Sequence, residues 1–147
     1  MEFGIAYPGR LDAWKDLARA EDLGFTHAWF YDSQLLYSDV YATMALAAEH
    51  TSRLKLGTLV AIPSNRIAPV TASAIATINY LAPGRAILGV GTGFTGRNTM
   101  GLPAMSAQSM QDYIIQVRGL LDGDDVLFRE GERERWSRLL HPATARG

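Results

Sequence analysis

The residues best suited to ligand chemistry lie where short apolar runs of the sequence end. A glycine-rich segment, residues 87–97, follows one such run and carries Gly91, Gly93 and Gly96 in the spacing G-x-G-x-x-G. That spacing is typical of loops that hold the pyrophosphate of a dinucleotide, because glycine lets the backbone approach the phosphates closely. Asp32 follows another apolar run, where a carboxylate can accept a proton or a hydrogen bond.

A dinucleotide site of the Rossmann type makes three demands on such a segment. The glycines follow the first strand, open directly into a helix, and precede an acidic residue by about 20 positions. Here the segment follows the fourth apolar run, about ten residues including Pro103 separate it from the next expected helix, and the position about 20 beyond Gly96 falls inside that helix. The pattern disfavours a Rossmann fold, and a small NAD(P)-binding doubly wound domain stays only as an alternative.

The elements that must position these residues alternate regularly. Apolar runs predict four strands, and segments with helical periodicity or capping residues predict a helix after each of them. The expected strands are 3–7, 27–31, 54–61 and 85–90, and the expected helices are 12–24 (capped by Asp12), 38–50 (capped by Ser38 or Asp39), 69–80 and 106–121. Strand starts recur every 24 to 31 residues, which is the period of a βα unit. The sequence therefore predicts a parallel α/β fold with ligand chemistry at the carboxyl ends of the strands.

The composition narrows the classes of function. The chain has 147 residues, no cysteine and a formal net charge of −1. It lacks the positive charge that nucleic acid binding needs, and it cannot form disulfides or thiolate metal sites. The three histidines are scattered, so no metal site is predicted. The apolar runs are shorter than the roughly 20 residues of a membrane helix, and the amino terminus has no signal-peptide pattern, so we expect a cytoplasmic protein without membrane contact.

The sequence after residue 122 differs from the βα series. Val126–Phe128 and Trp136–Leu140 read as two strands, and the charged segment Arg129–Arg135 between them reads as a solvated turn. We therefore divide the chain into residues 1–122, the βα region, and residues 123–147, a hairpin with an irregular end.

Several segments in order resemble the luciferase-like flavin-dependent oxidoreductases, which include bacterial luciferase, flavin monooxygenases and deazaflavin-dependent reductases such as methylenetetrahydromethanopterin reductase. The segments are FGIAYPG, HAWFYDS, AAEHTSRLKLGTLV and RIAPVTASAIATINYLAPGRAILGVGTG, and the resemblance covers residues 1–142. It implies a TIM (β/α)8 barrel of the bacterial luciferase type, of which this chain carries about four βα units and a terminal β-hairpin. The implied cofactor is FMN or an 8-hydroxy-5-deazaflavin coenzyme, and the implied substrate is a small organic molecule.

The resemblance also implies roles for individual residues. Asp32 would be the catalytic pocket carboxylate, and residues 59–61 match a place where many members carry a non-proline cis peptide. The implied cofactor-binding residues are Tyr7, Val60, Ala61, Gly91, Thr92 and Gly93. The implied substrate-binding residues are Ser33, Asn65, Arg66 and Phe94. Glycine at 91 and 93 would let the backbone approach the flavin ring, since a Cβ would block it.

Two departures from the family pattern limit what carries over. Many members have a histidine after the matching aspartate, whereas this chain has Ser33, whose hydroxyl is too weak an acid to protonate a substrate by itself. Members also have about twice this length, and their last strands supply the loops that hold the cofactor phosphate. Exposed strand edges at 3–7 and 85–90 would then need a second copy or a complementing carboxyl-terminal half, and a non-catalytic half-barrel is the alternative function.

Overall fold

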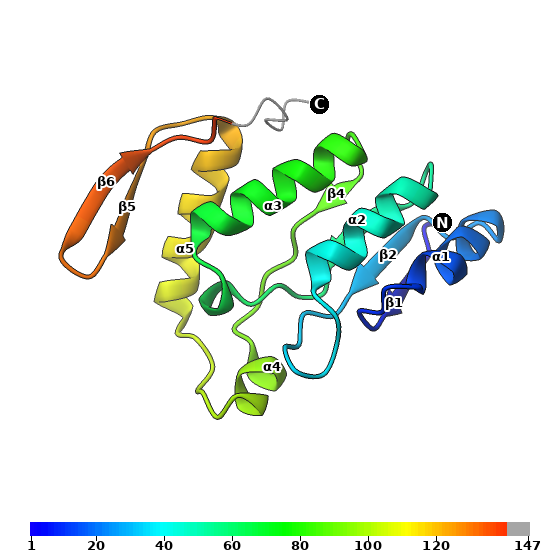
Figure 1. Ribbon diagram of the computed structural model, residues 1–147, viewed down its shortest axis with the longest axis horizontal. Coiled ribbons are helices and arrows are strands. Elements are labelled where there is room, and N and C mark those ends of the chain that lie inside the picture. The colour runs from blue at the N-terminus through cyan, green and yellow to red at the C-terminus, as the bar shows by residue number, and fades with distance from the viewer. Residues whose placement is uncertain (141–147) are drawn as a thin grey trace.

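The computed structural model describes residues 1–140 and contains one four-stranded parallel sheet. Its strands are β1 (Gly4–Tyr7), β2 (His27–Phe30), β3 (Lys55–Thr58) and β4 (Ala86–Ile87), in that spatial order. Helices α1 (Ala13–Asp22), α2 (Val40–His50) and α3 (Ala68–Leu81) connect consecutive strands and lie on one face of the sheet (Figure 1). The predicted series of βα units is confirmed.

Local chemistry explains where these helices begin and end. The Asp39 carboxylate accepts the backbone N–H groups of Tyr41 and Ala42, both at 3.0 Å, and so caps α2 as expected. Asp12 does not cap α1 in the same way, because its side chain binds Arg10 instead. That expectation was wrong: Asp12 has φ −95° and ψ 3°, outside the extended conformation that is typical of a capping residue, and its side chain makes no capping hydrogen bond.

The core lies between the sheet and its helices. Its largest fully buried side chains come from strands and helices alike, among them Phe30 and Leu56 from the sheet and Leu17 and Met44 from the helices. On the opposite face of the sheet, Gly4 and Ala6 of β1 are exposed. The hydrophobic effect therefore secures one face of the sheet and leaves part of the other face to solvent.

The region after β3 departs from the prediction. Strand β4 has two residues where six were expected, and an isolated bridge between Ala61 and Val90 continues the pairing. A short helix, α4 (Phe94–Thr99), begins directly after Gly93. The expectation that no helix opens behind the glycines was therefore wrong, because Gly93 adopts φ +82° and turns the chain straight into α4. The position after the fourth strand still separates this segment from a Rossmann site.

The carboxyl-terminal part contains the long helix α5 (Ala107–Asp122), which Ser106 caps through the Ser109 N–H at 3.1 Å. The hairpin follows as β5 (Val126–Glu130) and β6 (Arg133–Ser137). Its strands run into the charged segment 129–135, so the predicted turn shrinks to Gly131 and Glu132. The irregular end predicted for the chain lies outside the described residues after 140.

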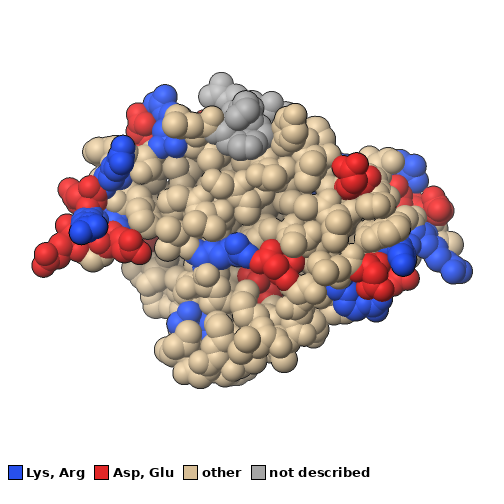
Figure 2. Space-filling view, viewed as in Figure 1, with Lys and Arg blue, Asp and Glu red and all other residues tan. Residues whose placement is uncertain are grey.

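Charge is distributed in mixed groups on the viewed face. Figure 2 shows acidic and basic side chains gathered over the β5–β6 hairpin and over α1, whereas the surface above α2 and α3 is mostly uncharged. Among residues 1–140, no helix has the length and apolar character needed to cross a membrane.

Candidate functional site

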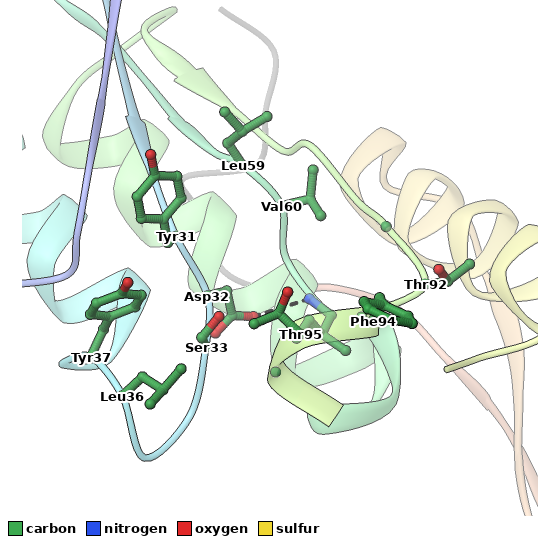
Figure 3. A pocket seen from close by; sticks show the side chains of 14 residues that line it. Tyr31, Asp32, Ser33, Leu36, Tyr37, Leu59, Val60, Thr92, Phe94 and Thr95 are labelled. Carbon is green, nitrogen blue, oxygen red and sulfur yellow. Dashed lines mark hydrogen bonds between the residues drawn. The ribbon is translucent and has the colours of Figure 1, made fainter. Parts of the chain in front are cut away.

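A cleft of about 540 Å³ lies at the carboxyl ends of β2, β3 and β4. Its walls come from the loop after β2, the segment after β3, and the glycine segment with the start of α4 (Figure 3). The lining residues are Tyr31, Asp32, Ser33, Leu36, Tyr37, Leu59, Val60, Ile62, Gly91, Thr92, Gly93, Phe94, Thr95 and Gly96. The volume is in the range of about 300–1,000 Å³ that is usual for small-molecule sites.

Asp32 carries the only formal charge among these lining residues and is 7% exposed. Its Oδ2 accepts the backbone N–H of Ile62 at 3.0 Å, and its Oδ1 accepts Nε2 of Gln34 at 2.5 Å. The predicted pocket carboxylate therefore lies in the cleft, where two amide donors fix its orientation.

The segment after β3 forms the wall beside Asp32. The peptide bond between Leu59 and Val60 is cis, as the family resemblance implied for this place. The Leu59 N–H donates to the Phe30 carbonyl at 2.7 Å, and the Ala61 N–H donates to the Gly89 carbonyl at 2.8 Å. Val60 lines the cleft as predicted, whereas Ala61 is buried behind it.

The glycines line the cleft, but the missing Cβ atoms face protein. A Cβ on Gly91 would lie 2.5 Å from Cγ2 of Val60, and one on Gly93 would lie 2.5 Å from Cγ2 of Ile62. The family resemblance implied that a flavin ring would occupy this space. In the structure, Gly91 and Gly93 instead let the segment before α4 pack against the segment after β3, which brings two walls of the cleft together.

Tyr7 does not reach the cleft. Its side chain packs with the core cluster between sheet and helices, and its hydroxyl donates to the Asp16 carboxylate of α1. That hydrogen bond, followed by desolvation and the charge of Asp16, raises the pKa of Tyr7. Since side chains alternate along a strand, Tyr7 points to the helix layer, and the structure gives no support for its predicted contact with a cofactor.

Asn65 and Arg66 line a second cleft of about 630 Å³ on the other side of the loop after β2. Arg66 forms an ion pair with Asp39 and lies 4.9 Å from the centre of the Tyr41 ring. Asn65 donates from Nδ2 to the side chain of Gln34. Both predicted substrate residues are thus engaged within the protein, while Ser33 and the 73% exposed Phe94 line the first cleft.

The predicted site residues did not include several residues of the cleft, notably Tyr31, Leu36 and Tyr37. Tyr31 directly precedes Asp32 at the end of β2, so its position at a strand end was an available signal. The Tyr31 and Tyr37 rings lie 5.9 Å apart on the side of the cleft opposite Phe94 (Figure 3). Within residues 1–140, no group of three or more His, Asp or Glu side chains could hold a metal ion.

A parallel sheet whose strand-end loops enclose a cleft has the arrangement of (β/α)8-barrel enzymes. The family described as luciferase-like monooxygenase matches residues 2–145 of this sequence. The chain belongs to that family, as its segments had indicated.

Two curated relatives are similar to this chain over about a third of their own length or less. A 5,10-methylenetetrahydromethanopterin reductase from Methanolobus tindarius is 38% identical over 109 residues, which cover 73% of this chain and 33% of the relative. An F420-dependent glucose-6-phosphate dehydrogenase from Kineococcus radiotolerans is 44% identical over 95 residues, which cover 58% of this chain and 27% of that protein.

Solved structures share the fold. The coenzyme F420-dependent tetrahydromethanopterin reductase from Methanopyrus kandleri has a TM-score of 0.76 and 29% identity, covering 98% of this chain and 45% of that one. The oxygenating constituent of 3,6-diketocamphane monooxygenase from Pseudomonas putida, solved with FMN, has a TM-score of 0.73 and 15% identity, covering 92% and 43%. This chain therefore spans a little under half of these luciferase-like TIM-barrel chains.

Proposed function

We propose that the first cleft binds the ring of an 8-hydroxy-5-deazaflavin coenzyme of the F420 type, as part of an oxidoreductase acting on a small organic molecule. The observation that carries this proposal is the cleft itself, in which Asp32, the apolar side chains of Leu59 and Val60, and the glycine segment meet at the strand ends. F420 is favoured because it is named for the relatives with 44% and 29% identity, whereas the FMN complex is only 15% identical. Oxygen activation on reduced FMN is the second candidate.

The residues of the cleft fit a flat, largely apolar ring with polar edges. Leu59 and Val60 offer apolar surface on one wall, and aromatic rings stand on the flanks (Figure 3). When bound, such a ring accepts or donates a hydride, and the protein supplies its orientation. Phe94 is 73% exposed, so a ligand that covered it would gain hydrophobic free energy.

The polar residues of the cleft have separate roles in this proposal. Both oxygens of Asp32 accept amide N–H groups, so the carboxylate is held in place to accept a further hydrogen bond from a ring edge or a substrate. The Ser33 hydroxyl can donate a hydrogen bond but is too weak an acid to deliver a proton by itself. Proton transfer then falls to Asp32 or to the phenol groups of Tyr31 and Tyr37, which also line the cleft.

We infer further that catalysis by the complete barrel needs structure beyond these four βα units. The chain spans a little under half of the solved structures it resembles, and part of the sheet's inner face is exposed. A second copy or a complementing half would cover that face and the edges of β1 and β4. The cleft assigned to the ring lies within the described residues, so binding can be tested on this chain.

The test is a fluorescence titration of the protein with F420, with FMN and NADPH as comparators. We expect saturable binding of F420, and Phe94→Ala should weaken it about five- to ten-fold because an apolar contact is lost. Phe3→Ala removes an exposed ring before β1, far along the sequence from the cleft, and serves as the matched control. Tighter binding of FMN would favour the monooxygenase candidate, and binding of NADPH alone would overturn both.

A further inference from the structure

Three side chains form a continuous hydrogen-bonded chain through the wall that separates the two clefts. Asn65 donates from Nδ2 to Oε1 of Gln34, and Gln34 donates from Nε2 to Oδ1 of Asp32 at 2.5 Å. Asp32 then accepts the Ile62 N–H at 3.0 Å, and the Ile62 carbonyl accepts the Asn65 N–H at 3.0 Å. These four hydrogen bonds close into a ring that joins residues 32–34 to residues 62–65.

The ring has a defined direction. An amide N–H can only donate, so both oxygens of Asp32 act as acceptors in these contacts. Gln34 must therefore turn its NH2 group toward Asp32 and its oxygen toward Asn65. Asn65 must in turn present its own NH2 group to Gln34, which leaves its Oδ1 free to accept a hydrogen bond at the second cleft.

The backbone conformation next to Gln34 independently indicates that the loop after β2 is held in place by hydrogen bonds. Leu35 has φ +68°, the left-handed region that leucine rarely adopts, and its side chain is 81% exposed. An exposed leucine gains little from packing that would offset this conformation. The loop after β2 must therefore be held by its neighbours, and Gln34 provides two hydrogen bonds directly beside Leu35.

We propose that Gln34 and Asn65 are positioning residues for Asp32, and through Asp32 for the Leu59–Ile62 wall of the first cleft. Neither side chain lines that cleft, so both act through the carboxylate. The importance of this role for a cofactor rests on the proposed function, because it assumes that the cleft receives the ring. The ring of hydrogen bonds itself can be measured without any ligand.

The first measurement is the hydrogen-exchange rate of the Ile62 amide by NMR on the full chain. Gln34→Met keeps the length of the side chain but removes its donor and acceptor, and we expect exchange at Ile62 to become about ten-fold faster. Asn65→Ala should act similarly. In the double variant, the exchange rate of the Ile62 amide should be little faster than in either single variant, since either change opens the same ring. Ser38→Ala, in the same loop, is the matched control and should leave Ile62 unchanged.

A second pair of variants tests whether hydrogen bonding at position 32, rather than its negative charge, holds the ring. In Asp32→Asn, the new amide can donate to Gln34 if both Gln34 and Asn65 rotate their carboxamides by half a turn. The two bonds between side chains are then kept with reversed polarity, while the backbone N–H groups of Ile62 and Asn65 donate as before. Ile62 should then stay protected in Asp32→Asn but lose protection in Asp32→Ala. Equal loss in both variants would overturn the ring, as would unchanged exchange in Gln34→Met with an otherwise native spectrum.

Titration with F420 separates this proposal from the proposed function. If the wild type binds F420, Gln34→Met should weaken binding about three- to ten-fold, while Ser38→Ala should not. Wild type that fails to bind, together with Ile62 exchange that still depends on Gln34, would remove the proposed function and leave the positioning role intact. If F420 binds normally but Ile62 exchange does not depend on Gln34 and Asn65, the proposed function stands and the positioning role is overturned.

Discussion

Two buried carboxylates lie at opposite ends of the sheet and are held in different ways. Glu21, 9% exposed near the end of α1, accepts the backbone N–H groups of Ser52, Arg53 and Leu54 at 2.5–3.1 Å. Asp32, 7% exposed after β2, accepts one backbone amide and one side-chain amide. The carboxylate at the amino end therefore binds backbone donors only, whereas the carboxylate at the cleft also depends on the side chain of Gln34.

A second charged group strengthens the amino end. Arg85, just before β4, donates to the carbonyls of Ala48 and Leu54 and to the hydroxyl of Thr51, at 3.0–3.1 Å. Desolvation by burial lowers the pKa of Arg85, although the charge of Glu21 acts in the opposite direction. Glu21 and Arg85 together fix the turn between α2 and β3. In barrels of this type, that end serves stability and the opposite end serves chemistry.

The largest effect should come from removing the amino-end carboxylate. Glu21→Ala leaves three backbone N–H groups without their acceptor, and we expect the free energy of unfolding to fall by about 3 kcal/mol. Asp32→Ala should cost about 1–2 kcal/mol, because fewer backbone donors lose a partner. Urea denaturation measures both, with Asp22→Ala, an exposed carboxylate of the same helix, as the control. A larger loss of unfolding free energy for Asp32→Ala than for Glu21→Ala would contradict this difference between the two ends of the sheet.

The contribution of Glu21 to stability should also depend on pH. Burial alone would raise the pKa of Glu21, but the three backbone hydrogen bonds and the charge of Arg53 outweigh it, so the pKa is lowered from 4.5. A carboxyl whose pKa is lower when folded stabilises the protein above its ordinary pKa, and this stability is lost as the pH falls below about 4.5.

Denaturation of the wild type and of Glu21→Gln at several pH values tests this sign. The difference in unfolding free energy between the two proteins should be largest near about pH 6. It should narrow as the pH falls toward about 3, because the wild-type carboxylate becomes protonated as well. A difference that stays constant over this range would mean that the charge of Glu21 does not contribute.

At the cleft end, the packing of Gly91 against Val60 should give a smaller effect. Gly91→Ala places a Cβ 2.5 Å from Cγ2 of Val60, and the stiff β-branched side chain can yield only by moving the wall, at a cost of about 1–2 kcal/mol. Adding Val60→Ala removes the clash and should restore part of this stability. If the two changes are simply additive, Gly91 is not required by this contact.

The sequence predicted the order of strands and helices better than it predicted the direction in which individual side chains point. The βα period and the residues at strand ends placed Asp32, Val60 and Phe94 at one cleft, because parallel strands bring their carboxyl ends together. Tyr7 lies away from this cleft, because its position at a strand end does not reveal which face of the sheet its side chain occupies. Alternation in β1, where Ile5 and Tyr7 pack with the core, decides that question.

Other features depend on contacts between distant segments and had no local signal. Helix α4 has six residues, FTGRNT, without an apolar period, and it contains Gly96. A Cβ on Gly96 would lie 2.5 Å from Cδ1 of Ile62 and 3.3 Å from the Asp32 carbonyl oxygen, so close packing against the loop after β2 favours glycine here. The ring through Gln34 and Asn65 is likewise invisible to sequence patterns, since it joins two loops about 30 residues apart.

The smallest effect should come from Arg66, which sharpens the contrast with Arg85 at the other end. Its ion pair with Asp39 is partly exposed, and its guanidinium lies over the Tyr41 ring. Arg66→Lys keeps the charge but loses the planar contact, so we expect a loss of about 0.5–1 kcal/mol in urea denaturation. Arg85→Lys should cost more, because a single ammonium cannot replace donors directed at three separate acceptors. Equal losses would show that the two ends of the sheet rely on their arginines to the same degree.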